Sequence, residues 1–270
     1  MPSPLITLTT DFGLSDAYVA EMKGAILAVA PHATIIDVTH LIPPQDVARG
    51  ARVVGRLADA FPRGTIHIAV VDPGVGSPRP LIAADLAHQH YLAPNNGLLS
   101  LAARRHPPQR VHRLTESQFW RRPVSATFHG RDILAPVAGH WALGTDLSRF
   151  GPVLETDLVN LPLVEPYWQG ATLVGEIVSI DGFGNLQTNI SAGLLPSEQR
   201  SAPTIVVVGA QIAGISRCYS EQPLQKLLAL IDSAGMLEIA VNQGNAAARL
   251  NARVGLEVRV TLPAGADDLS

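Results

Sequence analysis

Up to about residue 160, short apolar runs alternate with stretches of helical spacing. Compact apolar runs predict buried strands, at 5–9, 34–38, 66–71, 81–84 and 91–93. Apolar side chains three and four positions apart predict helices, at 17–29, 46–60, 98–105 and 132–142. Ser15 or Asp16 is a candidate N-cap of the first helix. This β-α-β-α-β order predicts a mainly parallel sheet flanked by helices.

The pattern changes after about residue 160, where the segment 161–166 (LPLVEP) has the composition of a linker. Beyond it, Gly, Asn and Asp separate dense apolar runs that predict strands at 173–180, 186–189, 205–208, 237–241 and 256–262. The segment 222–230 is a candidate for a lone helix. We therefore expect an α/β fold, with an N-terminal α/β domain at 1–162 and a smaller C-terminal antiparallel β-barrel-like domain at 168–270.

Composition narrows the class of protein. Hydrophobic residues make up 47% of the 270 and charged residues 16%, which predicts a sizeable core. The net charge is −3 without a basic block, so nucleic acid is not expected as the main partner. No apolar run approaches the length of a membrane span and no basic segment begins the chain, so a cytoplasmic protein is expected. Cys218 is the single cysteine, which excludes a disulfide within one chain.

A carboxylate ends the third predicted strand. Asp72 is followed by Pro73-Gly74-Val75-Gly76, a sequence suited to a tight reversal that could return Arg79 to Asp72. Open α/β sheets hold ligands at the carboxyl ends of their strands. The alternative is a polar loop with a surface ion pair.

Asp11 ends the first strand in the same way. Its two oxygens match the vicinal hydroxyls of a ribose, so a ligand role is favoured there. Asp16 is equally well explained as a cap of the following helix.

Two further segments have competing interpretations. His129, beside Gly130 and just before a helix, is a catalytic candidate, although a lone histidine is more often structural. The segment 181–185 (DGFGN) reads as a hairpin turn that also presents an aromatic ring between two polar side chains. Neither a complete dinucleotide fingerprint nor a Walker A sequence is present. No cysteine, aspartate or glutamate set completes a metal site with His88 and His90, so no catalytic metal is expected.

Taken together, these segments resemble the S-adenosyl-L-methionine (SAM) hydrolases, also called SAM hydroxide adenosyltransferases, which are relatives of the SAM-dependent fluorinase and chlorinase. The matching segments are 10–13 (TDFG) with Asp16, 71–76 (VDPGVG) with Arg79, 93–99 (APNNGLL), 127–132 (TFHGRD), 181–185 (DGFGN) with 188–189, and 233–242. They occur in the family's order over nearly the whole chain.

The resemblance implies hydrolysis of SAM to adenosine and L-methionine by water or hydroxide attacking C5′, without metal or cofactor. It further implies a homotrimer whose sites lie between subunits. Asp72, Arg79 and His129 match the family's catalytic set, and Asp11 matches its ribose carboxylate. The other substrate-binding residues implied are Asp16, Phe128, Gly130, Asp181, Phe183, Asn185, Ser233, Glu238 and Val241.

Within the wider group, the halogenases carry a tyrosine where this chain has Asp72, and His129-Gly130 replaces their halide-binding pair. A carboxylate repels a halide but can orient water, which favours hydrolysis. Gln45 and Ala234 depart from the fluorinase pattern, at an aromatic and an arginine position. A non-catalytic adenosine or SAM binder and a halogenase remain the alternatives.

Overall fold

The computed structural model describes residues 3–195 and 202–262. The chain divides into two compact units, Met1–Pro162 and Leu163–Ser270, and each is described by itself. The first unit contains β1 (Leu5–Thr10), α1 (Tyr18–Val29), β2 (Thr34–Thr39), α2 (Val47–Val54), α3 (Leu57–Ala60), β3 (Ile66–Val70), β4 (Leu81–Leu86), β5 (Gln89–Pro94), α4 (Ser100–Arg105), β6 (Arg110–Arg113), η1 (Ser117–Phe119), η2 (Gly130–Leu134), α5 (Ala135–Ala142) and η3 (Leu147–Phe150). The second contains β7 (Tyr167–Gln169), β8 (Thr172–Ile180), β9 (Leu186–Ser191), η4 (Ala192–Leu194), β10 (Thr204–Val207), β11 (Ala210–Ala213), η5 (Tyr219–Glu221), β12 (Leu227–Ile231), β13 (Met236–Val241), α6 (Ala246–Leu250) and β14 (Glu257–Thr261).

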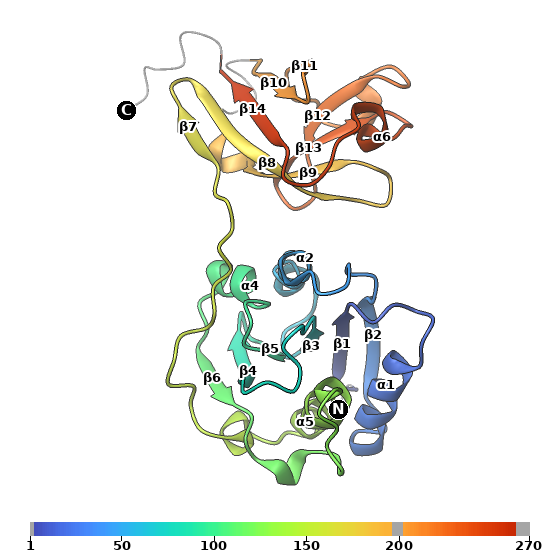
Figure 1. Ribbon diagram of the computed structural model, residues 1–270, viewed down its shortest axis with the longest axis vertical. Coiled ribbons are helices and arrows are strands. Elements are labelled where there is room, and N and C mark those ends of the chain that lie inside the picture. Colours follow the sequence, from blue (N-terminus) through green and yellow to red (C-terminus); the bar gives the residue numbers. More distant parts are fainter. Residues whose placement is uncertain (1–2, 196–201, 263–270) are drawn as a thin grey trace. The chain divides into compact units, whose positions relative to one another are not determined.

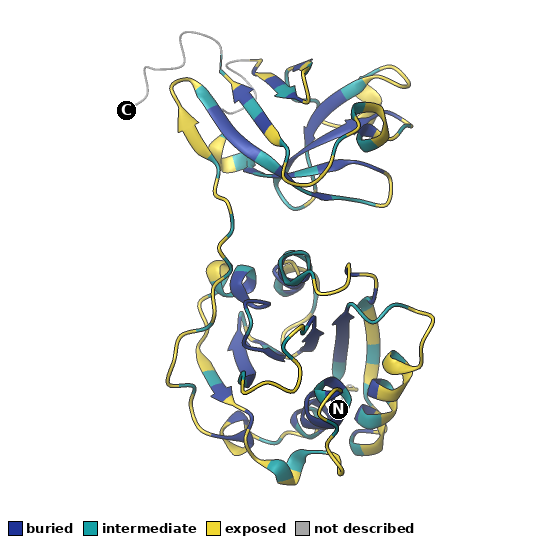
Figure 2. Cartoon of the chain, in the orientation of Figure 1, coloured by how far each residue is buried: buried dark blue, intermediate teal, exposed yellow. Residues whose placement is uncertain are grey.

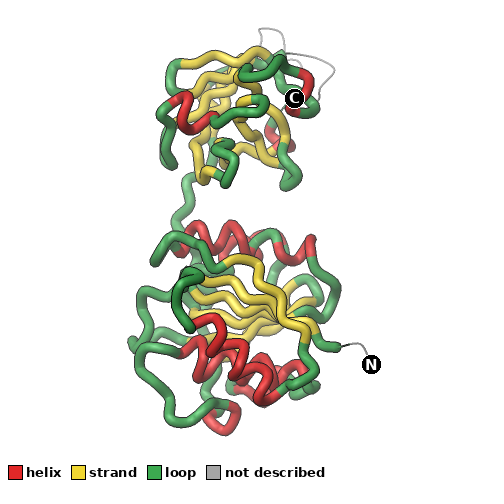
Figure 3. The backbone as a smooth tube through the Cα atoms, turned by 90° about the vertical axis from the view of Figure 1, so that its right-hand side faces the viewer, coloured by secondary structure: helices red, strands yellow, loops and turns green. Residues whose placement is uncertain are grey.

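The first unit is a three-layer α/β structure. Its six strands follow the order β2-β1-β3-β5-β4-β6, in which β2, β1, β3 and β5 are parallel (Figure 1). The last two strands, β4 and β6, run antiparallel to their neighbours, so the sheet is mixed. Helices cover both faces of the sheet (Figure 3).

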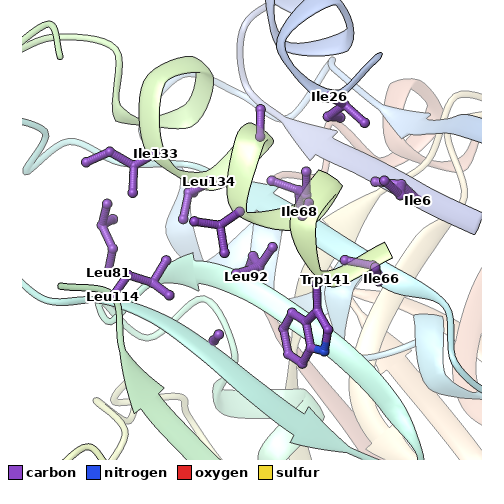
Figure 4. Packing of buried hydrophobic residues seen from close by; sticks show 14 of the residues in the cluster. Ile6, Ile26, Ile66, Ile68, Leu81, Leu92, Leu114, Ile133, Leu134 and Trp141 are labelled. Atoms are coloured by element: carbon purple, nitrogen blue, oxygen red, sulfur yellow. The ribbon is translucent and has the colours of Figure 1, made fainter. Parts of the chain in front are cut away.

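Alternating side chains of the sheet supply two cores. On one face Ile6 and Ile68 pack with α1 and α5, and the ring of Trp141 closes one end of this cluster (Figure 4). On the other face Val71 and Ala84 pack with α2 and α4. All five residues of the central strand β3 are buried, whereas the residues of edge strand β2 are exposed or of intermediate exposure (Figure 2). Burial on both faces fixes the carboxyl end of β3, where Asp72 follows.

The second unit is a nearly closed, antiparallel, barrel-like sheet. Its strand order is β11-β10-β14-β8-β9-β13-β12, with β7 paired to β8. A bridge between Ser216 and Leu230 brings the two ends of this order together. Successive side chains of a strand point to opposite faces of the sheet, so that Leu237, Ile239 and Val241 of β13 face the barrel core.

Three sequence predictions are wrong in detail. Residues 222–230 do not form a helix: Leu227–Ile231 is strand β12, which pairs with β13, because so short an apolar run does not distinguish the two structures. The helix at 46–60 is two helices, α2 and α3, interrupted where the carbonyl of Gly55 accepts from Arg105. Neither Ser15 nor Asp16 caps α1, which begins after Ala17 without a side-chain cap.

Candidate active site

The loop after β3 turns back sharply on itself. The amide of Val75 donates to the carbonyl of Asp72 (3.2 Å), and that of Ser77 donates to Gly74 (3.0 Å). Gly76 has φ +82°, and a Cβ there would lie 2.7 Å from the backbone oxygen of Ala126. Only glycine satisfies both conditions without strain. The reversal brings the side chain of Arg79 back onto the carboxylate of Asp72, seven positions earlier in the chain.

Arg79 binds Asp72 through both arms of its guanidinium. Its Nε lies 2.7 Å from Oδ1 and 2.9 Å from Oδ2, and Nη2 donates to Oδ2 as well. The two side chains are 10% and 6% exposed. A buried, bidentate pair holds the carboxylate in one orientation, unlike the surface ion pair that the sequence left as an alternative.

His129 completes a three-residue group with this pair. Its Nδ1 lies 3.4 Å from Nη1 and 3.3 Å from Nη2 of Arg79. Burial, followed by the positive charge of Arg79, lowers the pKa of His129 below its ordinary value. A neutral ring whose Nδ1 accepts from a guanidinium carries its proton on Nε2. His129 therefore offers Nε2–H as a donor.

The segment around His129 is anchored by a buried carboxylate. Asp132 is fully buried, and its oxygens accept from Arg131 (Nε–Oδ1 2.7 Å, Nη2–Oδ2 2.9 Å) and from the amide of Ser125 (2.9 Å). Arg131 also binds Glu21 of α1 (2.6 Å). These contacts tie the loop before η2 to η2 itself, and they tie η2 to α1. Arg131 and Asp132 thus serve to hold the histidine in place.

The neighbours of His129 are packed into the unit. Phe128 is 8% exposed and makes edge contacts with Phe12 and Tyr18, with ring centroids 5.7 and 5.4 Å apart. A Cβ at Gly130 would lie 3.4 Å from Sδ of Met22. The aromatic contacts connect the segment after Asp11 to the segment before His129.

Asp11 and Asp16 lie in the loop after β1, in different surroundings. One oxygen of Asp11, Oδ2, accepts from the amide of Gln45 at 2.8 Å, which orients the carboxylate at the end of the strand. The backbone of Gly13 then bonds to the carbonyl of His40 (2.8 Å). Asp16 is exposed, and its Oδ2 lies 3.4 Å from the hydroxyl of Ser15.

In the second unit, Asp181 organises the turn between β8 and β9. Its Oδ1 accepts from the amides of Phe183 and Asn185, each at 2.9 Å, and its Oδ2 accepts from the side chain of Asn185 at 3.1 Å. Phe183 is 79% exposed. The segment is a tight turn, as its sequence suggests, and it also presents a large bare aromatic surface.

Two family models match most of the chain. Residues 6–151 match the model of the SAM hydroxide adenosyltransferase N-terminal domain, and residues 175–259 match that of the C-terminal domain. The chain belongs to the SAM hydroxide adenosyltransferase family.

Individual relatives cover nearly the whole chain. A protein of Salinispora arenicola named (R)-S-adenosyl-L-methionine hydrolase is 42% identical, over 96% of this chain and 98% of its own. A protein of Nocardia brasiliensis named fluorinase is 28% identical, over 95% and 96%. The crystal structure of an uncharacterized conserved protein from Thermotoga maritima superposes with a TM-score of 0.89, at 33% identity, over 95% of this chain and 99% of that one.

The remaining residues that the family pattern implicates lie on or beside β13. Ser233 is in the β12–β13 turn, whose shape is set by Asp232 accepting from the amides of Ala234 (2.7 Å) and Met236 (2.9 Å). Glu238 is 3% exposed. The Val241 side chain, 4% exposed, belongs to the barrel core, so a ligand could reach this position through its backbone only.

Two side chains that bond to residues of the candidate site or their neighbours were given no role from the sequence, although one of them, Asn96, lies in the matching segment 93–99. Asn96 donates to the carbonyl of Val71 at 2.8 Å and so braces the strand end before Asp72. Tyr219 bonds Glu238 at 2.7 Å. The Asn95-Asn96 pair after β5 was a usable signal, because it follows a strand end. Nothing in the sequence around Tyr219 marked it.

Proposed function

We propose that this protein hydrolyses S-adenosyl-L-methionine to adenosine and L-methionine. The observation that carries the proposal is the largely buried pair of Asp72 and Arg79 at the carboxyl end of β3, together with the half-buried His129 that it contacts. The family membership and the relatives named (R)-S-adenosyl-L-methionine hydrolase support it. Because those names specify the (R) sulfonium, we propose the same epimer as the substrate.

In the proposed reaction, the oxygen of water forms a bond to C5′ of the ribose while the C5′–S bond breaks. The bonding electrons go to sulfur, which leaves as the neutral thioether of methionine. No acid or metal is needed to stabilise such a leaving group. The difficulty is the nucleophile, since free water is weak and must be oriented and partly deprotonated. A site for this reaction therefore needs an oriented base and a group that holds the water.

The three residues fit these needs. Arg79 leaves His129 with its proton on Nε2, so the imidazole acts as a donor to the water oxygen. Asp72 is the one negatively charged member of the three, and we assign it as the acceptor of the water proton. Arg79 orients the carboxylate and favours the developing hydroxide. Positioning of water against C5′ accounts for much of the rate, about 7–11 kcal/mol in well-oriented pairs.

We propose that Asp11 binds the ribose hydroxyls. The amide of Gln45 holds one of its oxygens, which orients the carboxylate toward a diol. We propose Phe183 and Asn185 for the adenine, because the turn that Asp181 organises presents an exposed ring beside an amide side chain. Asp16, Phe128, Gly130, Ser233, Glu238 and Val241 stay predictions of substrate contact.

The homotrimer, with sites between subunits, and the cytoplasmic location are likewise proposals. The presence of candidate ligand residues in both units supports the first, and light scattering of the purified protein would measure the assembly directly. Within residues 3–195 and 202–262, no helix has the length and apolar character that a membrane span requires.

The proposed activity is tested by incubating the purified protein with SAM in halide-free buffer and separating the products by chromatography. Equal amounts of adenosine and methionine are expected. Asp72→Asn should abolish them while the protein stays folded, and Asp157→Asn, at an exposed position of the same unit, serves as the matched control. Adenosine binding without products would move the protein to the binding class. A 5′-halo-adenosine formed only with added halide would make it a halogenase.

A further inference from the structure

Glu238 lies on the outer face of the barrel, yet it is buried. Its neighbours in β13, Leu237 and Ile239, point into the barrel core, so the alternation of the strand directs Glu238 to the opposite face. A carboxylate on that face would ordinarily be hydrated. Glu238 is nevertheless 3% exposed. Something on the outer face therefore covers it.

The cover includes Tyr219, from the short helix η5. Its hydroxyl donates to Oε1 of Glu238 at 2.7 Å. The segment is secured beside β13 because Asn242 donates to the carbonyl of Gln222 at 2.7 Å. Tyr219 is itself 43% exposed, although its hydroxyl is engaged by Glu238.

The negative charges of two other carboxylates, Asp181 and Asp232, also act on this tyrosine. Burial, the hydrogen bond to Glu238, and the negative charges of Glu238, Asp181 and Asp232 raise the pKa of Tyr219 to about 12. Asp181 belongs to the turn that holds Phe183 and Asn185, and Asp232 adjoins Ser233. The charges of carboxylates from three segments thus act on Tyr219, and its proton stays on the oxygen at neutral pH.

We propose that Tyr219 is a positioning residue for substrate binding, which acts by holding Glu238 to accept a hydrogen bond from a nitrogen donor of the substrate. The inference rests on the proposed function. SAM has two such donors, the 6-amino group of adenine and the ammonium group of the methionine end. The carboxylates of Asp181, Asp232 and Glu238 suit either one.

The decisive variant is Tyr219→Phe, which removes one oxygen and keeps the ring. KM for SAM is expected to rise about tenfold with kcat changed less than about twofold, as for the loss of one hydrogen bond to a charged group used in binding. Tyr167→Phe is the matched control, since Tyr167 is an exposed tyrosine of β7 in the same unit. An unchanged KM in folded Tyr219→Phe overturns the inference.

Adenosine affinity, measured by calorimetry, identifies the donor. A weaker adenosine affinity in Tyr219→Phe assigns the adenine amino group, whereas unchanged adenosine affinity with a raised KM assigns the ammonium group. Glu238→Gln and the double variant with Tyr219→Phe test whether Tyr219 acts through Glu238. If Tyr219 acts through Glu238, Tyr219→Phe has little further effect in the Glu238→Gln background, and full additivity contradicts the inference.

Failure of the proposed function gives a different result. In that case the wild-type protein forms no products from SAM. The affinity of wild type and Tyr219→Phe for SAM itself then replaces KM. An equal affinity of the two proteins would overturn the positioning role, and a weaker one in the variant would support it.

Discussion

Arg79 contacts both Asp72 and His129, its Nε lying 2.7 Å from Oδ1 of the carboxylate and its Nη2 3.3 Å from Nδ1 of the imidazole. One guanidinium therefore sets both the orientation of the Asp72 carboxylate, the proposed proton acceptor, and the tautomer of His129, the proposed donor to water. The contact joins the loop after β3 to the segment before α5, fifty positions later in the chain. Each of the two groups depends on the same arginine for its chemical role.

Arg79→Lys should lower kcat/KM at least about 30-fold. Lysine keeps the charge but cannot bond both carboxylate oxygens and Nδ1 at once, and truncating a partner of a buried charge pair costs about 2–5 kcal/mol. Steady-state kinetics with SAM measure the effect. Arg63→Lys, in the exposed segment before β3, is the control and should match wild type. Activity of Arg79→Lys near the wild-type level would show that the forked geometry is dispensable.

The pH profile of kcat/KM should fall on the acidic side, with a midpoint below 6.5. Burial and the charge of Arg79 lower the pKa of His129 from that ordinary value, against the opposing charges of Asp72 and Asp132. The ring is therefore neutral at pH 7, and protonation as the pH falls through the lowered pKa would remove the Nδ1 acceptor. His129→Asn should lack this limb. A midpoint above 6.5, or the same limb in the variant, contradicts the assignment.

Gly76→Ala should reduce both stability and activity. Alanine at φ +82° is strained, and its Cβ would lie 2.7 Å from the carbonyl of Ala126, so the loop carrying Arg79 must shift. Gly64→Ala is a close control, because Gly64 has φ +80° with open space around it. The control should cost about 1 kcal/mol in the free energy of unfolding and leave kcat unchanged. Equal kinetic effects in the two variants would show that activity does not depend on the geometry of the loop after β3.

Acid should destabilise the first unit through His67. His67 is 1% exposed; its Nδ1 accepts from Thr7 (2.7 Å) and its Nε2 donates to Gln89 (2.9 Å). In the folded protein the imidazole is therefore neutral. Burial lowers its pKa from 6.5 to about 4. The unfolded chain therefore takes up the proton first as the pH falls, and stability is complete above pH 6.5 and is lost between there and pH 4.

The size of this effect is about 3 kcal/mol, since one pKa unit corresponds to about 1.4 kcal/mol. Urea unfolding at pH 7, 5.5 and 4 measures it. In His67→Gln the free energy of unfolding should decline less over this range. Parallel declines in wild type and variant would mean that another group takes up the proton.

Much of the local structure could be predicted from the sequence, because local contacts dictate it. The run Ile66–Val71 was predicted as a strand because it is short, apolar apart from His67, rich in β-branched residues and followed at once by Asp72-Pro73-Gly74. The proline and glycines after Asp72 likewise predicted the turn. The stretch Leu227–Ile231 was predicted as part of a helix because its apolar run is compatible with either structure. This stretch is a strand because it pairs with β13, which is a tertiary contact.

By itself, the sequence determined the β-α-β-α-β order of the first unit, the change to a strand-rich second unit and the motifs that place this chain in its family. These follow from hydrophobic periodicity and turn chemistry, which act over a few residues. Only the tertiary structure decided that Arg79 reaches His129 and that Tyr219 covers Glu238, since these contacts join positions 50 and 19 residues apart. Burial and the charges of distant neighbours, which no short stretch of sequence contains, set the protonation of both His129 and Tyr219.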